Sequence, residues 1–307
     1  MTLHLLITRA LQLGMGMSMS MAWVPGLAQD ILSDYEREAF DSPEGWAMAH
    51  TVAASLNLGT GPGQTMEVGQ WRVSAELGSI PHLSREDQRV GFGGFKLEDM
   101  NKSPVFGRGR LHVGLPAAIT AELSWTPPLK INGGRPEHLF GLALERALWR
   151  NGSWQLGARL FAVRGDASGD TTCSRSVATR APGSAGNPFG CRAPSVDTLR
   201  MDHDGLELAL SRSLGDGRWQ PFVAVASTHM KPYVEIKARV FDSLDLSELE
   251  SSGTVQTLSA GTLFRATPSW QMSLAASWTP LDVRRPAQYN RRSHDFWSIR
   301  LGLAWLR

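Results

Sequence analysis

The stretch LFGLALERALWRNGSWQLGARLFAV, residues 139–163, decides the fold. In its first arm Leu142 and Leu144 alternate with small or polar residues, and its second arm alternates in the same way. Asn151-Gly152 lies between the two arms, and this dipeptide within period-two alternation predicts an antiparallel hairpin. The second arm has about ten residues, which is the length that a tilted strand needs to cross a bilayer.

The same alternation recurs along the rest of the chain. It predicts ten strands, over residues 66–77, 105–115, 118–127, 139–150, 154–163, 200–213, 219–240, 254–265, 270–278 and 295–306. The connections alternate between short turns, near residues 116, 151, 216 and 267, and longer segments, at 78–104, 128–137, 165–199, 241–253 and 279–294. Transmembrane barrels have short periplasmic turns and longer outer loops. The sequence therefore predicts an all-β, transmembrane, antiparallel up-and-down barrel.

Ten strands is the preferred number. Twelve is the alternative, if residues 48–58 and 88–97 also form strands. The segment 241–253 is acidic and is expected to hold a short helix through residues 244–249.

Composition excludes other classes of protein. No run of about twenty apolar residues occurs beyond the N-terminus, which excludes a helical membrane protein. The net charge of +2 gives no argument for a nucleic-acid partner, so none is expected. The chain has 11 Trp against 3 Tyr, and Trp suits a membrane interface because its ring is half apolar and half hydrogen-bonding.

The N-terminal part divides into two segments. Residues 1–28 have the character of a secretory signal peptide, cleaved near Ala28. Residues 29–65 are expected to form a periplasmic segment with a helix near 43–57, because Ser42-Pro43-Glu44 is a helix start and apolar residues follow at helical spacing. This helix would lie at or inside the periplasmic mouth of a barrel formed by residues 66–307.

Two cysteines, Cys173 and Cys191, could close a loop of about nineteen residues. Export would carry them to an oxidising compartment, so we expect a disulfide bond. Metal binding is a weaker interpretation, because two cysteines lack a clustered histidine. No G-x-S-x-G motif, zinc signature or phosphate loop is present, so no metal and no cofactor is expected.

Together the leader, the amphipathic strands and the aromatic-apolar final strand resemble Gram-negative outer-membrane β-barrel proteins. Arg89-Val90-Gly91-Phe92, residues 99–104 and Gly114-Leu115-Pro116 resemble an uncharacterised proteobacterial barrel family. The resemblance implies residence in the cell outer membrane, contact with its lipid, and assembly by the barrel-assembly machinery. That machinery usually reads a terminal aromatic residue, whereas here Trp305 is followed by Leu306-Arg307. The resemblance supplies no activity, and the oligomeric state stays open.

Charged residues alternate with the apolar face and are therefore expected in the lumen. They are Arg72, Glu76, Arg108, Arg110, His112, Glu122, Glu145, Arg159, Glu207 and Arg300. A barrel of about ten strands is only modestly wider than one that its own side chains fill. Charges confined there are retained when they are paired, which favours a salt-bridged interior plug. A narrow polar conduit that favours anions is the alternative.

Two stretches contain residue types used in hydrolytic enzymes. In Asp202-His203-Asp204 alternation points His203 away from both carboxylates, and in Ser293-His294-Asp295 sequence proximity alone does not produce a relay. We interpret both as solvated loop residues, and no catalytic residue is assigned.

The basic connection 279–294 contains Arg284, Arg285, Arg291 and Arg292. As outer-loop residues these could contact lipopolysaccharide phosphates, because arginine binds phosphate in a forked geometry. A solvated basic loop is the alternative. The sequence thus predicts an outer-membrane barrel that is either a narrow channel or transporter for small solutes or a filled structural or surface-interaction barrel. An outer-membrane enzyme is the third and least favoured interpretation.

Overall fold

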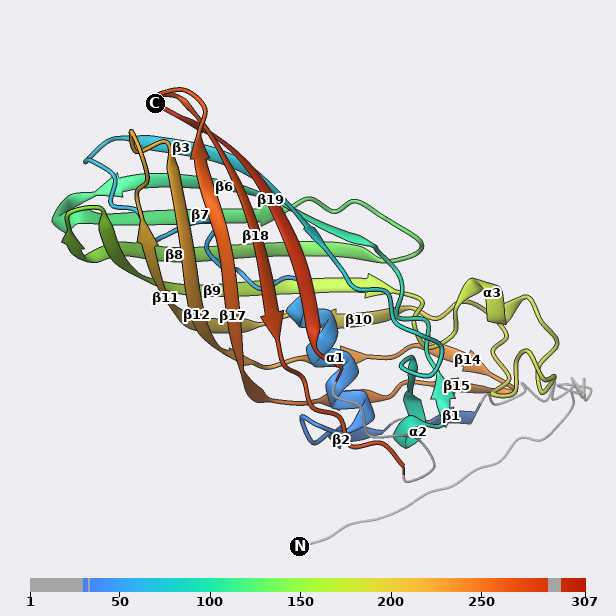
Figure 1. Ribbon diagram of the computed structural model, residues 1–307. Helices are drawn as coiled ribbons and strands as arrows, with labels where there is room; N and C mark the ends of the chain where they lie inside the picture. Colours follow the sequence, from blue (N-terminus) through green and yellow to red (C-terminus); the bar gives the residue numbers. More distant parts are fainter. Residues whose placement is uncertain (1–29, 33, 287–293) are drawn as a thin grey trace, which may run out of the picture.

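Ten long strands form a closed antiparallel barrel in the computed structural model, which describes residues 30–32, 34–286 and 294–307 (Figure 1). Within this part the barrel strands are β3 (Trp71–Ser79), β6 (Val105–Leu115), β7 (Ile119–Thr126), β8 (Arg135–Asn151), β9 (Trp154–Gly169), β11 (His203–Arg212), β12 (Trp219–Met230), β17 (Gly253–Arg265), β18 (Trp270–Thr279) and β19 (Phe296–Leu306). Each pairs with its neighbour in this order, and β19 pairs with β3 to close the barrel. The ten-strand prediction is confirmed.

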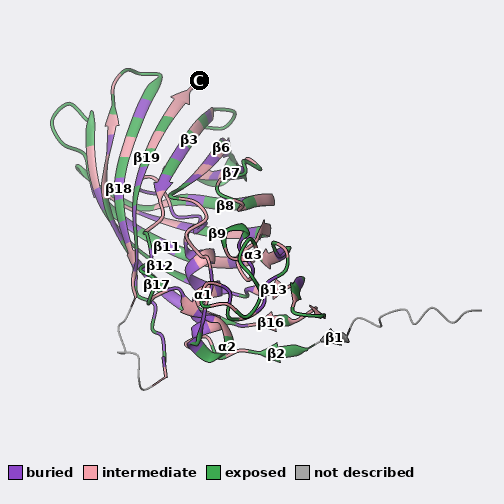
Figure 2. Cartoon of the chain, turned by 90° about the vertical axis from the view of Figure 1, so that its right-hand side faces the viewer, coloured by how far each residue is buried: buried purple, intermediate pink, exposed green. Residues whose placement is uncertain are grey.

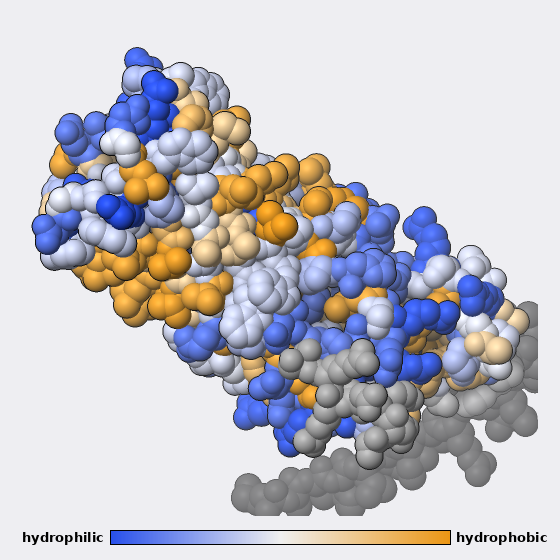
Figure 3. Space-filling view, in the orientation of Figure 1, coloured by the Kyte–Doolittle hydropathy of each residue, from blue (hydrophilic) through white to orange (hydrophobic). Residues whose placement is uncertain are grey.

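Buried and exposed residues alternate along the barrel strands, as the colours of Figure 2 show, because successive side chains of a strand point to opposite faces of the wall. In β19, Trp297, Ile299 and Leu301 are 57%, 59% and 55% exposed, whereas Ser298 and Arg300 are both 4% exposed. On the face that Figure 3 shows, hydrophobic residues gather in a band over the barrel, between more hydrophilic ends. Such a band is suited to lipid contact. No helix in the described part of the chain is long and apolar enough to cross a membrane.

The two ends of the barrel differ in the length of their connections. One end, here called the turn end, has tight connections and the chain's C-terminus (Figure 1). Among them are η1 (Pro116–Ala118) and the β8–β9 turn, where Gly152 has a φ of +55° that favours glycine. The opposite end, here called the loop end, has the long connections. They fold into a head outside the barrel.

Short elements build this head. They are β1 (Asp30–Leu32), β2 (Tyr35–Arg37), β4 (Arg89–Val90), α2 (Gly91–Gly94), β5 (Lys96–Leu97), α3 (Arg175–Ala178), β10 (Asp197–Arg200), β13 (Tyr233–Glu235), β14 (Ala238–Val240), β15 (Ser243–Asp245) and β16 (Glu248–Glu250). The pairings β9–β10–β13–β16–β2 extend the barrel sheet beyond the loop end. Residues 88–97, which are a barrel strand in the twelve-strand alternative, instead form a small hairpin in this head.

Two predictions in the head are wrong. Residues 244–249 are not helical, because β15 and β16 pair in parallel with the N-terminal strands β1 and β2. The long strand predicted over 219–240 ends at Met230 and resumes as β13. Pro232, which has no N–H to donate to a ladder, lies in that break.

The N-terminal segment enters the barrel. Helix α1 (Pro43–Ala53) begins where expected, with the Ser42 hydroxyl accepting a hydrogen bond from Gly45 N at 3.0 Å. The following segment 54–70, here called the thread, is held by the barrel wall and leads into β3 at the turn end. Residues 66–70 therefore belong to the thread, and the first strand starts at Trp71 rather than at residue 66.

Helix α1 lies at the loop end, which corrects the expected position at the mouth with the short turns. Its Trp46 contacts His294, and its N-terminal Pro43 lies beside Gly94 of α2. The thread can cover the distance to the turn end, because an extended chain spans about 3.3 Å per residue. Residues 30–32 and 34–53 are consequently on the side of the long connections.

Cysteine labelling tests this placement. We expect Glu36→Cys, in the exposed strand β2, to react with a membrane-impermeant maleimide in intact Gram-negative cells, because long barrel connections face outward. Ser153→Cys, in the β8–β9 turn, should react only after the outer membrane is permeabilised. The opposite pattern of labelling on a gel would refute the placement.

Candidate functional site

The lumen contains all ten charged residues selected from the sequence, and all are buried. Their exposed fractions run from 2% to 6%, for Arg72, Glu76, Arg108, Arg110, His112, Glu122, Glu145, Arg159, Glu207 and Arg300. Strand register explains why they meet. Glu76 lies opposite Arg108, His112 opposite Glu122, and Glu145 opposite Arg159. Opposite charges in directly facing positions stabilise adjacent strands.

Glu122 is the centre of the network. Its carboxylate accepts from Arg110 at 3.0 Å and from Arg159 at 2.7 Å, and His112 Nε2 lies 3.0 Å away. Arg110 continues to Glu76, and Arg159 continues to Glu145 at 3.0 Å. Since each carboxylate here has cationic partners within hydrogen-bond distance, the buried charges compensate one another.

The thread is bound through its main chain. Arg300 donates to the carbonyl of Leu56 at 2.8 Å, Arg159 to that of Asn57 at 2.6 Å, and Arg110 to that of Leu58 at 2.9 Å.

Arg108 donates to the carbonyl of Ser55 and to the side chain of Asn57. The amide of Asn57 lies 3.3 Å from the Glu122 carboxylate. Four arginines from three strands therefore bind four consecutive residues of the thread. Sequence reasoning missed Asn57, because a lone asparagine in an apolar stretch carries no pattern.

Close contacts continue toward the turn end. Glu207 accepts from Gly59 N, and a Cβ on Gly157 would lie 2.7 Å from Gly63 N. Main chain therefore packs against main chain at this point, which requires glycine. A cavity beside Thr60 and Arg72 measures about 20 Å³, enough for about one water molecule. The thread fills the lumen in the described structure.

One group of potential metal ligands occurs among the described residues. Ligand atoms of His112, Glu122 and Glu145 lie within 4.8 Å of one another. The same carboxylates already bind Arg110 and Arg159, so a cation would face two guanidinium groups at short range. The arrangement is suited to holding the wall and the thread together rather than to binding a metal.

An aromatic cluster anchors α1 at the loop end. The His50 ring lies 5.1 Å from Trp46 and 5.2 Å from Phe296, and the Arg285 guanidinium lies 5.5 Å from the Trp46 ring. Burial lowers the pKa of His50 to about 4, and His294 adds to this lowering while Asp87 opposes it. His50 is therefore neutral when it packs here.

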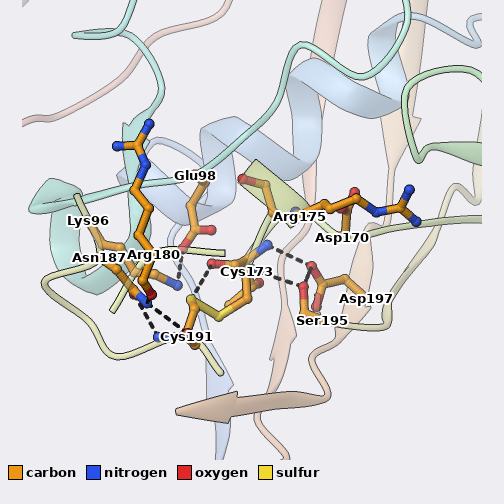
Figure 4. The surroundings of a disulfide bond; sticks show 12 residues. Lys96, Glu98, Asp170, Cys173, Arg175, Arg180, Asn187, Cys191, Ser195 and Asp197 are labelled. Carbon is orange, nitrogen blue, oxygen red and sulfur yellow. Dashed lines mark hydrogen bonds and ion pairs between the residues drawn. A yellow bond between two sulfur atoms is a disulfide. The ribbon is translucent and has the colours of Figure 1, made fainter. Parts of the chain in front are cut away.

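In the head, the predicted disulfide bond between Cys173 and Cys191 is confirmed (Figure 4). Asn187 donates to the carbonyl of Cys191 at 2.7 Å and accepts from its N–H at 2.7 Å. Cys173 N donates to Ser195, whose hydroxyl donates to Asp197 at 2.8 Å. These bonds hold the loop against β10 and make the head an ordered structure.

Of the four arginines proposed to contact lipopolysaccharide, two have partners within the protein. Arg284 pairs with Asp41 at 2.6 Å. Arg285 is 7% exposed and donates to the carbonyls of Asp87 and Arg89 at 2.8 and 2.7 Å, which corrects its expected place in a solvated loop. Arg291 and Arg292 lie outside the described residues, as does the predicted signal peptide.

Neither enzyme-like stretch forms a triad among the described residues. His203 points inward, is 1% exposed, and has Nδ1 2.9 Å from the Met201 carbonyl. Asp202 and Asp204 lie on the outer face beside Arg164, at 3.8 and 3.6 Å.

The second stretch is only partly described, since Ser293 lies outside the described residues. His294 Nε2 lies 2.9 Å from Asp87, and Asp295 accepts from the Trp278 indole at 2.8 Å. These two side chains therefore have separate partners.

No family model and no curated protein matches this chain. Solved structures that match are outer-membrane barrels. The outer membrane protease OmpT of Escherichia coli aligns at 9% identity and a TM-score of 0.41, over 81% of this chain and 100% of its own. Ail of Yersinia pestis aligns at 9% identity and a TM-score of 0.29, over 79% of this chain and 100% of its own. The N-terminal barrel domain of Pseudomonas aeruginosa OprF aligns at 9% identity and a TM-score of 0.28, over 79% of this chain and 100% of its own. Scores this low carry no functional argument, and the fold stands on the strand pairing described above.

Removing the central carboxylate tests the network. We expect Glu122→Ala to lower the free energy of unfolding by about 3–5 kcal/mol, because it leaves Arg110 and Arg159 buried with too few partners. Urea unfolding in detergent measures this. Asp242→Ala is the control, since its pair with Arg192 is at the surface and Asp242 is 95% exposed. Equal stability of wild type and Glu122→Ala would contradict the assigned role.

Acid should weaken the anchor of α1. Between pH 6.5 and about 4 the unfolded chain binds a proton at His50 that the folded chain does not, so stability falls as the pH falls through this window. The loss relative to His50→Phe, which keeps the aromatic packing, should reach about 3 kcal/mol. Unfolding free energies of both proteins across this pH range provide the measurement, and parallel profiles would contradict the prediction.

Proposed function

We propose that this chain is an outer-membrane barrel sealed by its own N-terminal segment, which presents a disulfide-closed head at the cell surface and conducts no solutes in this state. The observation that carries the proposal is the binding of the thread's carbonyls by Arg108, Arg110, Arg159 and Arg300 inside the wall. Occupied by main chain, the lumen leaves no continuous path for a solute.

Outer-membrane residence is supported by three features. The barrel is closed and leaves no strand edge in lipid, its outer face has an apolar band, and its connections are short at one end and long at the other. The leader predicted over residues 1–28 agrees with export.

Surface interaction suits the head better than catalysis. Residues 171–196 contain Arg175, Arg180 and Arg192 and no acidic residue, and the disulfide bond fixes this segment. A basic, cross-linked surface is suited to anionic partners. The lipopolysaccharide contact inferred from the sequence belongs to the same class of partner.

A channel that opens when the thread leaves is the second candidate. It is favoured by one observation: hydrogen bonds and contacts hold the thread, whereas the wall strands pair with one another without it. Five arginines against four glutamates would then line the lumen, so an opened pore would favour anions.

Conductance in planar bilayers tests the proposal. We expect wild type to be silent and a variant lacking residues 44–66 to give discrete, anion-selective openings, because the deletion removes most of α1 and of the thread and leaves the wall's own ion pairs in place. Deletion of residues 34–38, which removes β2 in the head, is the matched control and should stay silent.

Each outcome has a clear meaning. Stable openings of wild type would overturn the sealed barrel and support the channel. Silence of the 44–66 deletion, with heat-modifiable migration showing a folded barrel, would show that the thread is not what closes the lumen.

A further inference from the structure

Four exposed tryptophans lie at the turn end of the outer wall. They are Trp149, Trp154, Trp219 and Trp270, which are 47%, 42%, 50% and 45% exposed. Tryptophans with an apolar ring surface and a hydrogen-bonding N–H gather at the level of lipid headgroups. This end of the apolar band therefore lies at the boundary between hydrocarbon and headgroups.

Two arginines lie on lipid-facing rows toward the turn end. Arg146 follows Leu142 and Leu144 on the outer face of β8, and its neighbour Glu145 points inward. Arg212 follows Leu208 and Leu210 in the same manner on β11.

Strand β9 lies between these two arginines. Arg146 lies opposite Ala158 and Arg212 opposite Trp154. The Arg212 guanidinium lies 5.4 Å from the Trp154 ring. Arg146, Trp149, Trp154 and Arg212, on three adjacent strands, are here called the basic patch.

The cations of the basic patch are not balanced by acids. In the part of the chain that the structure describes, neither Arg146 nor Arg212 has an ion pair. At the loop end, by contrast, Arg135 pairs with Glu137, and Arg164 lies beside Asp202 and Asp204. Arg135 and Arg164 at the loop end thus have acidic partners, whereas among the described residues Arg146 and Arg212 at the turn end have none.

We propose that the basic patch binds the phosphate of anionic glycerophospholipids in the leaflet on the turn-end side. An arginine on a lipid-facing row lays its aliphatic stem along apolar surface and places the guanidinium at headgroup depth. At that depth the planar guanidinium fork suits a phosphate. The tryptophans beside it contact the lipid where the acyl chains meet the headgroups. Hydrophilic residues border the apolar band at this end (Figure 3).

Tryptophan quenching by brominated lipids tests the proposal on the full chain. Wild type is reconstituted into vesicles that contain brominated phosphatidylglycerol or brominated phosphatidylcholine, and the relative association constant of the two lipids is measured. We expect wild type to prefer phosphatidylglycerol, and the double variant Arg146→Gln/Arg212→Gln to lose about fivefold of this preference for each arginine. The preference should fall as salt is added.

Three comparisons keep the result specific. Arg146→Lys/Arg212→Lys keeps the charge but not the fork, so it should retain only the part of the preference that is due to charge, which separates lipid binding from a folding defect. Arg135→Gln changes an exposed arginine at the other end of the same strand β8 and should behave as wild type. Equal association of both lipids with wild type, an unchanged preference in the double glutamine variant, or an equal loss in Arg135→Gln would each overturn the proposal.

Discussion

The requirement that a buried charge has a partner governs this structure. A guanidinium in a closed barrel of this size has neither bulk water nor lipid headgroups to solvate it. Glu122 forms ion pairs with Arg110 and Arg159. Arg110 also pairs with Glu76, and Arg159 also pairs with Glu145, so the ion pairs link neighbouring strands. The guanidinium donors that remain after these pairings face the barrel axis. Carbonyls of residues 55–58 of the thread accept hydrogen bonds from four of these arginines there.

That arrangement unites features that are separate in the sequence. The wall's arginines need acceptors, and residues 55–58 supply them. The thread in turn requires small residues where it touches the wall, as at Gly63 against Gly157. At the loop end the thread continues into α1, which is fixed by aromatic packing around His50. Wall, thread and head therefore behave as one structure, with the lumen as its core.

Side-chain periodicity explains how much could be predicted. The wall could be predicted from the sequence because every second residue of a strand faces lipid. Leu142 and Leu144 therefore indicate the outer face, and Glu145 indicates the inner face. The position of the thread could not be predicted from the sequence, because its hydrogen bonds use main-chain carbonyl and amide groups that nearly every residue has. The helix predicted over residues 244–249 was wrong for a related reason. This segment pairs with strands near the N-terminus, and a pattern read from neighbouring residues alone does not include those partners.

The direction of the thread constrains the order of assembly. It runs from the head, along the barrel axis, to the start of β3, and β3 pairs with the final strand β19 at the seam. A thread that is joined to β3 cannot enter a closed barrel unless all the residues that precede it in the chain pass through the lumen. Closure of the β3–β19 seam around a segment already in position avoids that passage, and the polypeptide then serves as the template around which its own wall forms.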